Sequence, residues 1–235
     1  YYGPADKLQE EVMSVITDSR KTEEGCLFVP IVGERVDAHK FIPQVMEAGA
    51  LATLSERVLD NADFPYIAVE SSLQAVKDIA EFYLKQLQIP VVGITGSVGK
   101  TTTREMISTV LASQKKVFQT IGNQNSQIGV PLTLSHLTRE DEIAVLEIGM
   151  SERGQIEKLT NMIRPNVAVV TMIGVSHIAQ LKTQENICLE KMDIVKGLPE
   201  DGMVFLNGDD KFLAPYRGKL SHKTFFYGMD KACDY

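Results

Sequence analysis

The clearest chemistry in the sequence lies in a glycine-rich segment that ends in a lysine and two threonines, Thr95-Gly96-Ser97-Val98-Gly99-Lys100-Thr101-Thr102. It joins an apolar run that predicts a strand (91–95) to a pattern that predicts a helix (100–112). Glycines let backbone N–H groups approach phosphate oxygens closely, and the start of a helix attracts anions. Lys100 would reach the outer phosphates, and Thr101 would offer its hydroxyl to Mg²⁺. The segment therefore predicts a phosphate-binding loop, with Mg-ATP as the expected ligand.

This loop departs from the usual P-loop spacing at one position. The common pattern has a glycine five residues before Gly99, where this sequence has Ile94, and Gly96 lies closer in. The alternative to a variant phosphate loop is a glycine-rich turn that binds nothing. The order Gly-Lys-Thr-Thr between a strand and a helix favours the phosphate loop.

Two further residues stand at or near the ends of predicted strands. Glu147 lies in an apolar run (143–148), where a carboxylate is costly to bury unless it is paired or binds a metal. It is therefore either an edge carboxylate that faces water or a Mg²⁺ ligand beside Thr101. His177 follows another apolar run (167–172), and both a surface role and a ligand role are open for it.

The remaining polar candidates are weaker. Asn207 ends a predicted strand before Gly-Asp-Asp, so it either forms a turn or offers its amide to a nucleotide base. Lys191 lies on a predicted helix, where lysines are usually solvated. The loop 122–133, which contains Asn123, is rich in amides and is either a connection or a ligand contact. His39 is interpreted as a loop histidine that faces water.

The composition bounds the classes of function. The chain has 24 Lys and Arg against 31 Asp and Glu, a net charge of −7, which argues against a general nucleic-acid or membrane-surface role. No apolar run approaches the ~20 residues of a membrane span, and no signal peptide is expected at the start. Three widely spaced cysteines form no metal or disulfide pattern and fit the reducing cytoplasm. The opening Tyr1-Tyr2-Gly3, without Met, suggests a fragment of a longer protein.

Apolar runs that alternate with helical patterns predict an α/β fold: a small mixed α/β N-terminal domain followed by a P-loop domain whose mostly parallel sheet is flanked by helices. Ligands of such sheets lie beyond the carboxyl ends of the strands. A proline at position 90 places the domain boundary at 88–90. The predicted strands are 12–17, 27–32, 51–54, 66–69, 91–95, 143–148, 167–172, 203–207 and 224–227. The predicted helices are 40–48, 71–87, 100–112, 154–163 and 184–195.

Together these motifs resemble the Mur ligases, the ATP-dependent amide-forming enzymes of peptidoglycan assembly. The resemblance covers nearly the whole chain. In the second half it rests on the phosphate loop, Glu147 in Leu-Glu-Ile-Gly-Met, Gly174-Val175-Ser176-His177, Lys191 and Asn207-Gly208-Asp209-Asp210. In the first half it rests on Asp18-Ser19-Arg20-Lys21, Gly25-Cys26-Leu27-Phe28-Val29-Pro30 and the segment 33–42.

The resemblance implies roles for particular residues. Lys100, Lys191 and His177 would be catalytic. Thr101 and Glu147 would hold one Mg²⁺, and His177 with a carbamylated Lys191 would hold a second. Asn123 and Asn207 would approach the nucleotide base. Ser19, Arg20 and the loop 33–41 would contact a UDP-sugar, unless Arg20 is a surface ion-pair residue.

The resemblance also implies a reaction, most like that of the family member acting last on the stem peptide. Residues 1–88 would bind UDP-MurNAc-peptide, residues 89–235 would form an incomplete ATP-binding domain, and a C-terminal ligase domain is expected to be missing. The whole enzyme would join D-Ala-D-Ala to UDP-MurNAc-tripeptide through an acyl phosphate, as a cytoplasmic monomer.

Some positions depart from the family pattern, namely Ser126, Ser151-Glu152-Arg153 and Val175-Ser176. The alternatives are therefore a Mur-type ligase that adds diaminopimelate or lysine, a folylpolyglutamate-type ligase, and a non-catalytic UDP-sugar or nucleotide-binding module. A P-loop GTPase or kinase is disfavoured because the sequence has no Asn-Lys-x-Asp segment for reading guanine.

Overall fold

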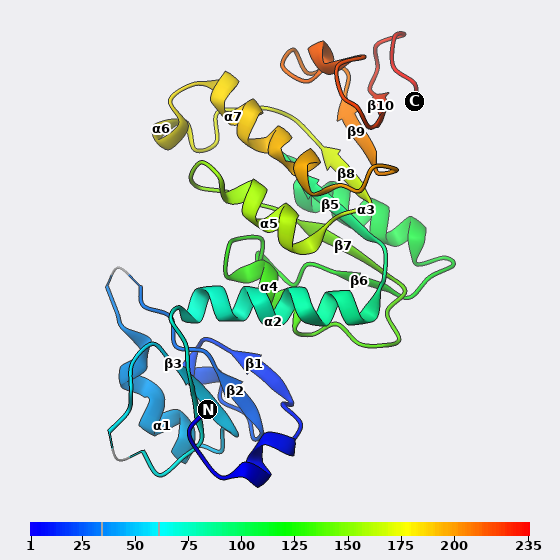
Figure 1. Ribbon diagram of the computed structural model, residues 1–235. Coiled ribbons are helices and arrows are strands. Elements are labelled where there is room, and N and C mark those ends of the chain that lie inside the picture. The colour runs from blue at the N-terminus through cyan, green and yellow to red at the C-terminus, as the bar shows by residue number, and fades with distance from the viewer. Residues whose placement is uncertain (34, 61) are drawn as a thin grey trace. The chain divides into compact units, whose positions relative to one another are not determined.

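The computed structural model describes residues 1–33, 35–60 and 62–235, and it divides into two compact units, 1–80 and 81–235 (Figure 1). The division falls inside helix α2 (Ser72–Leu87), eight residues before the predicted boundary. Ser71 caps the start of this helix, because its hydroxyl accepts a hydrogen bond from the Gln74 N–H at 3.2 Å. No helix among the described residues is long and apolar enough to cross a membrane.

The first unit contains a parallel four-stranded sheet in the order β1-β2-β3-β4. Three of its strands, β1, β2 and β4, are shorter than predicted, and β3 is shifted by one residue. Pro30, for instance, has no N–H with which to continue the second strand. A short 3-10 helix (Ala38–Phe41) leads into helix α1 (Ile42–Glu47). The strands are β1 (Ser14–Ile16), β2 (Cys26–Phe28), β3 (Ala52–Ser55) and β4 (Tyr66–Ala68).

The second unit contains a parallel six-stranded sheet in the order β10-β9-β8-β5-β7-β6. The strand that precedes the phosphate loop, β5, pairs with β7 on one side and β8 on the other. The carboxyl ends of these three strands therefore meet at one edge. The strands are β5 (Val91–Thr95), β6 (Val117–Gln119), β7 (Ile143–Glu147), β8 (Val167–Val170), β9 (Met203–Asn207) and β10 (Lys223–Tyr227).

Helices cover both faces of this sheet. Helix α3 packs through Ile107 and Leu111 on the face that carries Ile94 and Val145. On the opposite face, a Cβ added at Gly93 would lie 3.5 Å from Ile194, which follows the last long helix. The helices are α3 (Lys100–Leu111), α4 (Gly129–Leu134), α5 (Gln155–Ile163), α6 (Ile178–Leu181) and α7 (Gln184–Met192), which continues as a 3-10 helix (Asp193–Gly197).

The predicted fold class is confirmed, since both sheets are parallel and helices flank the second on both faces. Among the strands and α-helices of the described residues, three short ones are missing from the predictions: β6, α4 and α6. The residues of β6 are only half-buried at the edge of the sheet, so the strand lacks a long apolar run. The predicted helix 184–195 ends its α-helical part at Met192, because the chain tightens there into the 3-10 turn.

Candidate nucleotide-binding site

The loop between β5 and α3 is held by the end of the neighbouring strand β8. Gly96 and Gly99 have φ angles of +150° and +88°. A Cβ at Gly96 would lie 1.8 Å from the Oγ1 of Thr171, so only glycine fits there. Thr171 donates from this hydroxyl to the Val98 carbonyl at 2.6 Å, and the Ser97 N–H donates to the Met172 carbonyl at 2.8 Å. Contacts within the protein therefore hold the shape of the loop.

Lys100, the first residue of α3, folds back over this loop. Its Nζ donates to the carbonyl of Gly96 at 2.9 Å. Burial lowers the pKa of Lys100, and the negative charge of Glu147 opposes that shift. The position of Nζ suits contact with an anion that rests on the loop.

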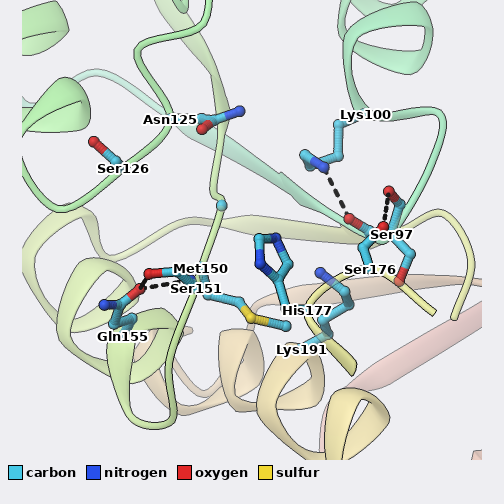
Figure 2. Close-up of a pocket in the computed structure, with 12 residues that line it drawn as sticks. Ser97, Lys100, Asn125, Ser126, Met150, Ser151, Gln155, Ser176, His177 and Lys191 are labelled. Carbon is cyan, nitrogen blue, oxygen red and sulfur yellow. Dashed lines mark hydrogen bonds between the residues drawn. The ribbon is translucent and has the colours of Figure 1, made fainter. Parts of the chain in front are cut away.

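A cavity of about 300 Å³ opens beside the loop. Figure 2 shows that its side chains come from separate segments and converge on one space. Besides Ser97 and Lys100, its lining includes Asn125, Ser126, Ser151, Gln155, Ser176, His177 and Lys191.

Lys191 is the most deeply buried of the cavity's cations, and only 2% of its surface is exposed. The expectation from its helical position, a solvated lysine, is wrong. Helix α7 turns this residue inward, beside His177 (Figure 2). Burial lowers the pKa of Lys191 to about 7, the positive charge of Lys100 adds to the shift, and Glu190 opposes it.

His177 precedes α6 and adopts a left-handed conformation with φ of +64°. Its ring faces the cavity although the residue is largely exposed (Figure 2). Burial lowers the pKa of His177, and the positive charges of Lys191 and Lys100 lower it further. These effects favour the neutral imidazole, the form that binds metals.

Glu147, the last residue of β7, is buried, so the alternative of an edge carboxylate facing water is wrong. Its Oε1 lies 3.1 Å from Nη1 of Arg104, and its Oε2 accepts a 3.4 Å hydrogen bond from Asn125. The sequence predictions missed Arg104. The available signal was a charged residue on the face of α3 that also carries the apolar Ile107 and Leu111.

Several predicted ligands lie outside the cavity. Thr101 and Thr102 are exposed on the first turn of α3, and Asn123 is exposed as well. In the same loop it is Asn125 that lines the cavity. Asn207 accepts a hydrogen bond from the Asp209 N–H at 3.0 Å, which is the geometry of a turn. Its contact with a base stays a prediction.

Asp210, from the motif that follows β9, has a positioning role that residue type alone did not reveal. Its Oδ2 accepts from the N–H of Ile173 at 2.7 Å, and its Oδ1 accepts from the N–H of Phe212 at 2.8 Å. The carboxylate thereby fixes the segment that leads to His177.

In the first unit, Arg20 forms two hydrogen bonds to Asp18, at 2.9 and 2.8 Å, and 87% of its side chain is exposed. These bonds lower the pKa of Asp18 to about 2. A ligand role for Ser19 and Arg20 stays a prediction, as does that of the loop 33–41, in which Glu34 lies outside the described residues.

His39, expected to face water, is instead buried. Its Nδ1 lies 2.7 Å from Asp37, and its Nε2 accepts from the N–H of Glu56 at 3.0 Å. These contacts make it a structural histidine that ties two loops of the first unit together.

The residues beside the loop fit a divalent cation that is shared with a nucleotide. Oε1 of Glu147 is buried and accepts no hydrogen bond from the described residues, so its lone pairs are open. Within residues 1–33, 35–60 and 62–235, no three His, Cys, Asp or Glu side chains form a metal cage. Mg²⁺ needs no such cage, because it usually keeps waters and takes its other ligands from one or two carboxylates and the substrate phosphates.

A glycine-rich loop between a parallel strand and a helix, a lysine above it and a buried acid on the next strand define a P-loop nucleotide-binding domain. Residues 94–235 match the family model of the Mur ligase middle domain. The chain therefore belongs to the Mur ligase family, as the sequence motifs indicated.

Two relatives with similar sequence share the same enzyme name. The UDP-N-acetylmuramoyl-tripeptide–D-alanyl-D-alanine ligase of Bacillus subtilis is 42% identical over 97% of this chain and 50% of the relative. The enzyme of that name from Escherichia coli is 38% identical over 84% of this chain and 43% of the relative. The chain thus spans about half the length of the curated relatives that it matches.

Solved structures agree with these sequence matches. MurF from Acinetobacter baumannii has a TM-score of 0.90 at 32% identity, over 96% of this chain and 49% of its own. MurF ligase from Thermotoga maritima, solved in complex with ADP, has a TM-score of 0.84 at 34% identity, over 92% and 50%. FolC of E. coli shares the fold alone, with 19% identity and a TM-score of 0.51 over 66% of this chain and 46% of its own.

Proposed function

We propose that this chain supplies the UDP-sugar-binding and ATP-binding parts of a ligase that joins D-Ala-D-Ala to UDP-MurNAc-tripeptide through an acyl phosphate. The observation that carries the proposal is the convergence of Lys100, His177 and Lys191 on one cavity beside the phosphate loop. The names of the similar relatives point to the same reaction.

The geometry suits the chemistry of this reaction. A carboxylate and an amine do not condense readily in water, so the carboxylate must first be phosphorylated to give it a good leaving group. Bringing phosphate and carboxylate oxygens together requires concentrated positive charge. Lys100 and the loop N–H groups supply such charge on the nucleotide side, and His177 and Lys191 face the space where the second oxygen group would lie.

Bound Mg²⁺ would neutralise phosphate oxygens during the transfer. Thr101 and Glu147 would hold one ion, and His177 with Lys191 would hold another. Lys191 suits that role after carbamylation, because reaction of its neutral amine with CO₂ gives a carboxylate-like oxygen ligand. A pKa near 7 leaves about half of the amine neutral at that pH.

The remaining assignments belong to the same proposal. Residues 1–88 would bind the UDP-MurNAc moiety through Ser19 and Arg20, and residues 89–235 would bind ATP, with Asn123 and Asn207 near the base. We propose a monomer in the cytoplasm. All three cysteines are free, which suits a reducing compartment.

The test is a ligation assay with the complete gene product that contains this chain. ATP, Mg²⁺, UDP-MurNAc-tripeptide and D-Ala-D-Ala are expected to give ADP, phosphate and a UDP-MurNAc-pentapeptide, the last identified by mass spectrometry. Phosphate release that requires diaminopimelate or lysine in place of D-Ala-D-Ala would instead support another Mur-type ligase. Binding of UDP-MurNAc-tripeptide without ATP turnover would support a non-catalytic module.

A further inference from the structure

A polar cluster lies beneath helix α3, on the face that otherwise packs apolar side chains against the sheet. Arg104 and Ser108 are buried on that face, and Glu147 ends the strand beneath. Three atoms of the cluster lack a hydrogen-bond partner among the described residues: Nε of Arg104, Oγ of Ser108 and Oε1 of Glu147. A cluster with such open polar atoms is costly to bury and poorly suited to stability alone.

Arg104 connects three segments through one guanidinium group. Its Nη1 donates to the carbonyl of Thr120 at 2.8 Å and to the carbonyl of Gly122 at 3.4 Å, and it lies 3.1 Å from Oε1 of Glu147. Its Nη2 pairs with the exposed carboxylate of Glu105. Helix α3, the end of β7 and the segment after β6 are thus joined at a single side chain.

The distribution of hydrogens on Arg104 has a chemical consequence. The two hydrogens of Nη1 point to the carbonyls of Thr120 and Gly122. The Glu147 carboxylate is therefore attracted by the positive charge of Arg104 without accepting a directed hydrogen bond from it. The lone pairs of Oε1 stay open, and Oε2 has only the 3.4 Å contact from Asn125. The carboxylate is anchored but still able to bind a cation or a water bound to that cation.

We propose that Arg104 is a positioning residue for the divalent cation of the bound nucleotide. It holds the Glu147 carboxylate electrostatically while leaving its oxygens open, and its bonds to Thr120 and Gly122 fix the segment that brings Asn125 beside the carboxylate. This inference rests on the proposed function, because it assumes that Glu147 binds the nucleotide's Mg²⁺. Lysine cannot replace this arginine, since a single ammonium lacks the planar fork that reaches several acceptors at once.

The experiment measures ADP binding to the complete gene product that contains this chain, by calorimetry, with EDTA and with Mg²⁺. In the wild-type protein, Mg²⁺ is expected to tighten ADP binding. R104K should weaken that Mg²⁺-dependent gain about tenfold, the lower end of what loss of a metal ligand's supporting partner costs. Its affinity for ADP in EDTA should stay within about twofold, because the phosphate loop itself is untouched. R104Q provides a second variant, and circular dichroism and thermal melts check that both fold.

A double-mutant cycle identifies the route of the effect. E147Q alone should remove most of the gain from Mg²⁺, and adding R104K to E147Q should change it by less than about twofold, since Arg104 acts through Glu147. R139K, an arginine-to-lysine change at an exposed position, is the matched control and should match wild type. E105Q removes the exposed partner of Arg104 and should also match wild type.

The outcomes separate the two proposals. If the complete wild-type protein does not bind ADP, or binds it without any gain from Mg²⁺, the proposed function fails. If the wild-type protein shows the gain and R104K retains it, the inference about Arg104 is wrong. The inference would also be overturned if R104K weakened ADP binding equally with and without Mg²⁺, or if its effect were undiminished in the E147Q background. Unfolding of both R104K and R104Q would overturn it as well. In each case Arg104 would be a residue of general structural support.

Discussion

The two parallel sheets place an arginine–carboxylate pair at or beside their carboxyl edges, and the pairs differ in burial. Arg20 and Asp18 are 2.8 Å apart with 87% of the arginine side chain exposed, whereas Arg104 and Glu147 are 3.1 Å apart with 7% and 2% exposed. Water screens the first pair, so it contributes little to stability. The second pair is costly to bury and strongly coupled to its surroundings. Burial, rather than the presence of charges near strand ends, distinguishes the second edge and supports the nucleotide site proposed there.

Lys191 provides the largest test of this contrast. Lys191→Ala in the complete gene product is expected to lower turnover by on the order of 10³-fold, because it removes a buried group that would face the reacting oxygens in the proposed reaction. Activity is measured as ATP-dependent phosphate release. Added acetate or formate should restore part of it if the carbamylated side chain serves as a metal ligand. Normal turnover in the variant would mean that a buried charge at this edge need not be functional.

Gly96 tests whether the buried edge depends on close packing around the loop. Gly96→Ala should destabilise the chain by about 2–3 kcal/mol, because the new Cβ would lie 1.8 Å from Thr171 at a φ of +150°. The measurement is urea unfolding followed by circular dichroism. The matched control is Gly154→Ala, which has φ of +78° but no atom within 4 Å of the new Cβ, so only the backbone cost of about 1 kcal/mol applies. Similar losses in both variants would argue against a specially packed loop.

The sequence predicted features that depend on local patterns. Strand β9 occupies the predicted residues 203–207, and the phosphate loop follows β5 as predicted. These features follow from apolar periodicity and from the glycine–lysine spacing, which are visible in a single segment. The family resemblance implied metal-ligand roles for Glu147 and Lys191, whereas the sequence around each residue left its role open.

Burial of individual polar residues could not be predicted, because it depends on segments far apart in the chain. Lys191 is covered because α7 packs beside α5, where the carboxylate of Glu190 accepts hydrogen bonds from the N–H groups of Gly154 and Ile156. His39 is buried by contacts to residues 37 and 56. Arg104 is engaged by carbonyls 16 and 18 residues further along the chain. No local pattern reports such contacts.

The pH dependence of stability examines the environment of Lys191 directly. The pKa of this lysine falls from 10.5 to about 7 on folding, so between these values the unfolded chain binds one more proton than the folded chain. Wild-type stability should therefore rise with pH relative to Lys191→Met, by at most roughly 1.4 kcal/mol per pH unit. Three titratable residues near Lys191 are present in both proteins, so the comparison isolates the lysine itself: Lys100, His177 and Glu190. Urea unfolding from pH 7 to 9 measures the difference, and a pH-independent gap would show that Lys191 is better solvated than the structure indicates.

Arg20 should give the smallest effect on stability and sharpens the comparison from the exposed side. Arg20→Ala is expected to leave the urea midpoint unchanged, because the pair with Asp18 is exposed and screened. If Arg20 binds the diphosphate of a UDP-sugar, the same variant should weaken UDP binding to this chain about tenfold, since an arginine fork makes paired bonds to phosphate.

Asp18→Asn separates the two roles of Arg20. It removes the ion pair but keeps the arginine, so UDP affinity should be retained or improved when the guanidinium no longer has to leave a carboxylate partner. Calorimetry with UDP measures both variants. Unchanged affinity in Arg20→Ala would make this residue a surface ion-pair partner only, and the two sheet edges would then differ in ligand binding as well as in burial. Weaker binding in Arg20→Ala alone would show that an exposed edge can also hold a ligand, with the arginine exchanging one anionic partner for another.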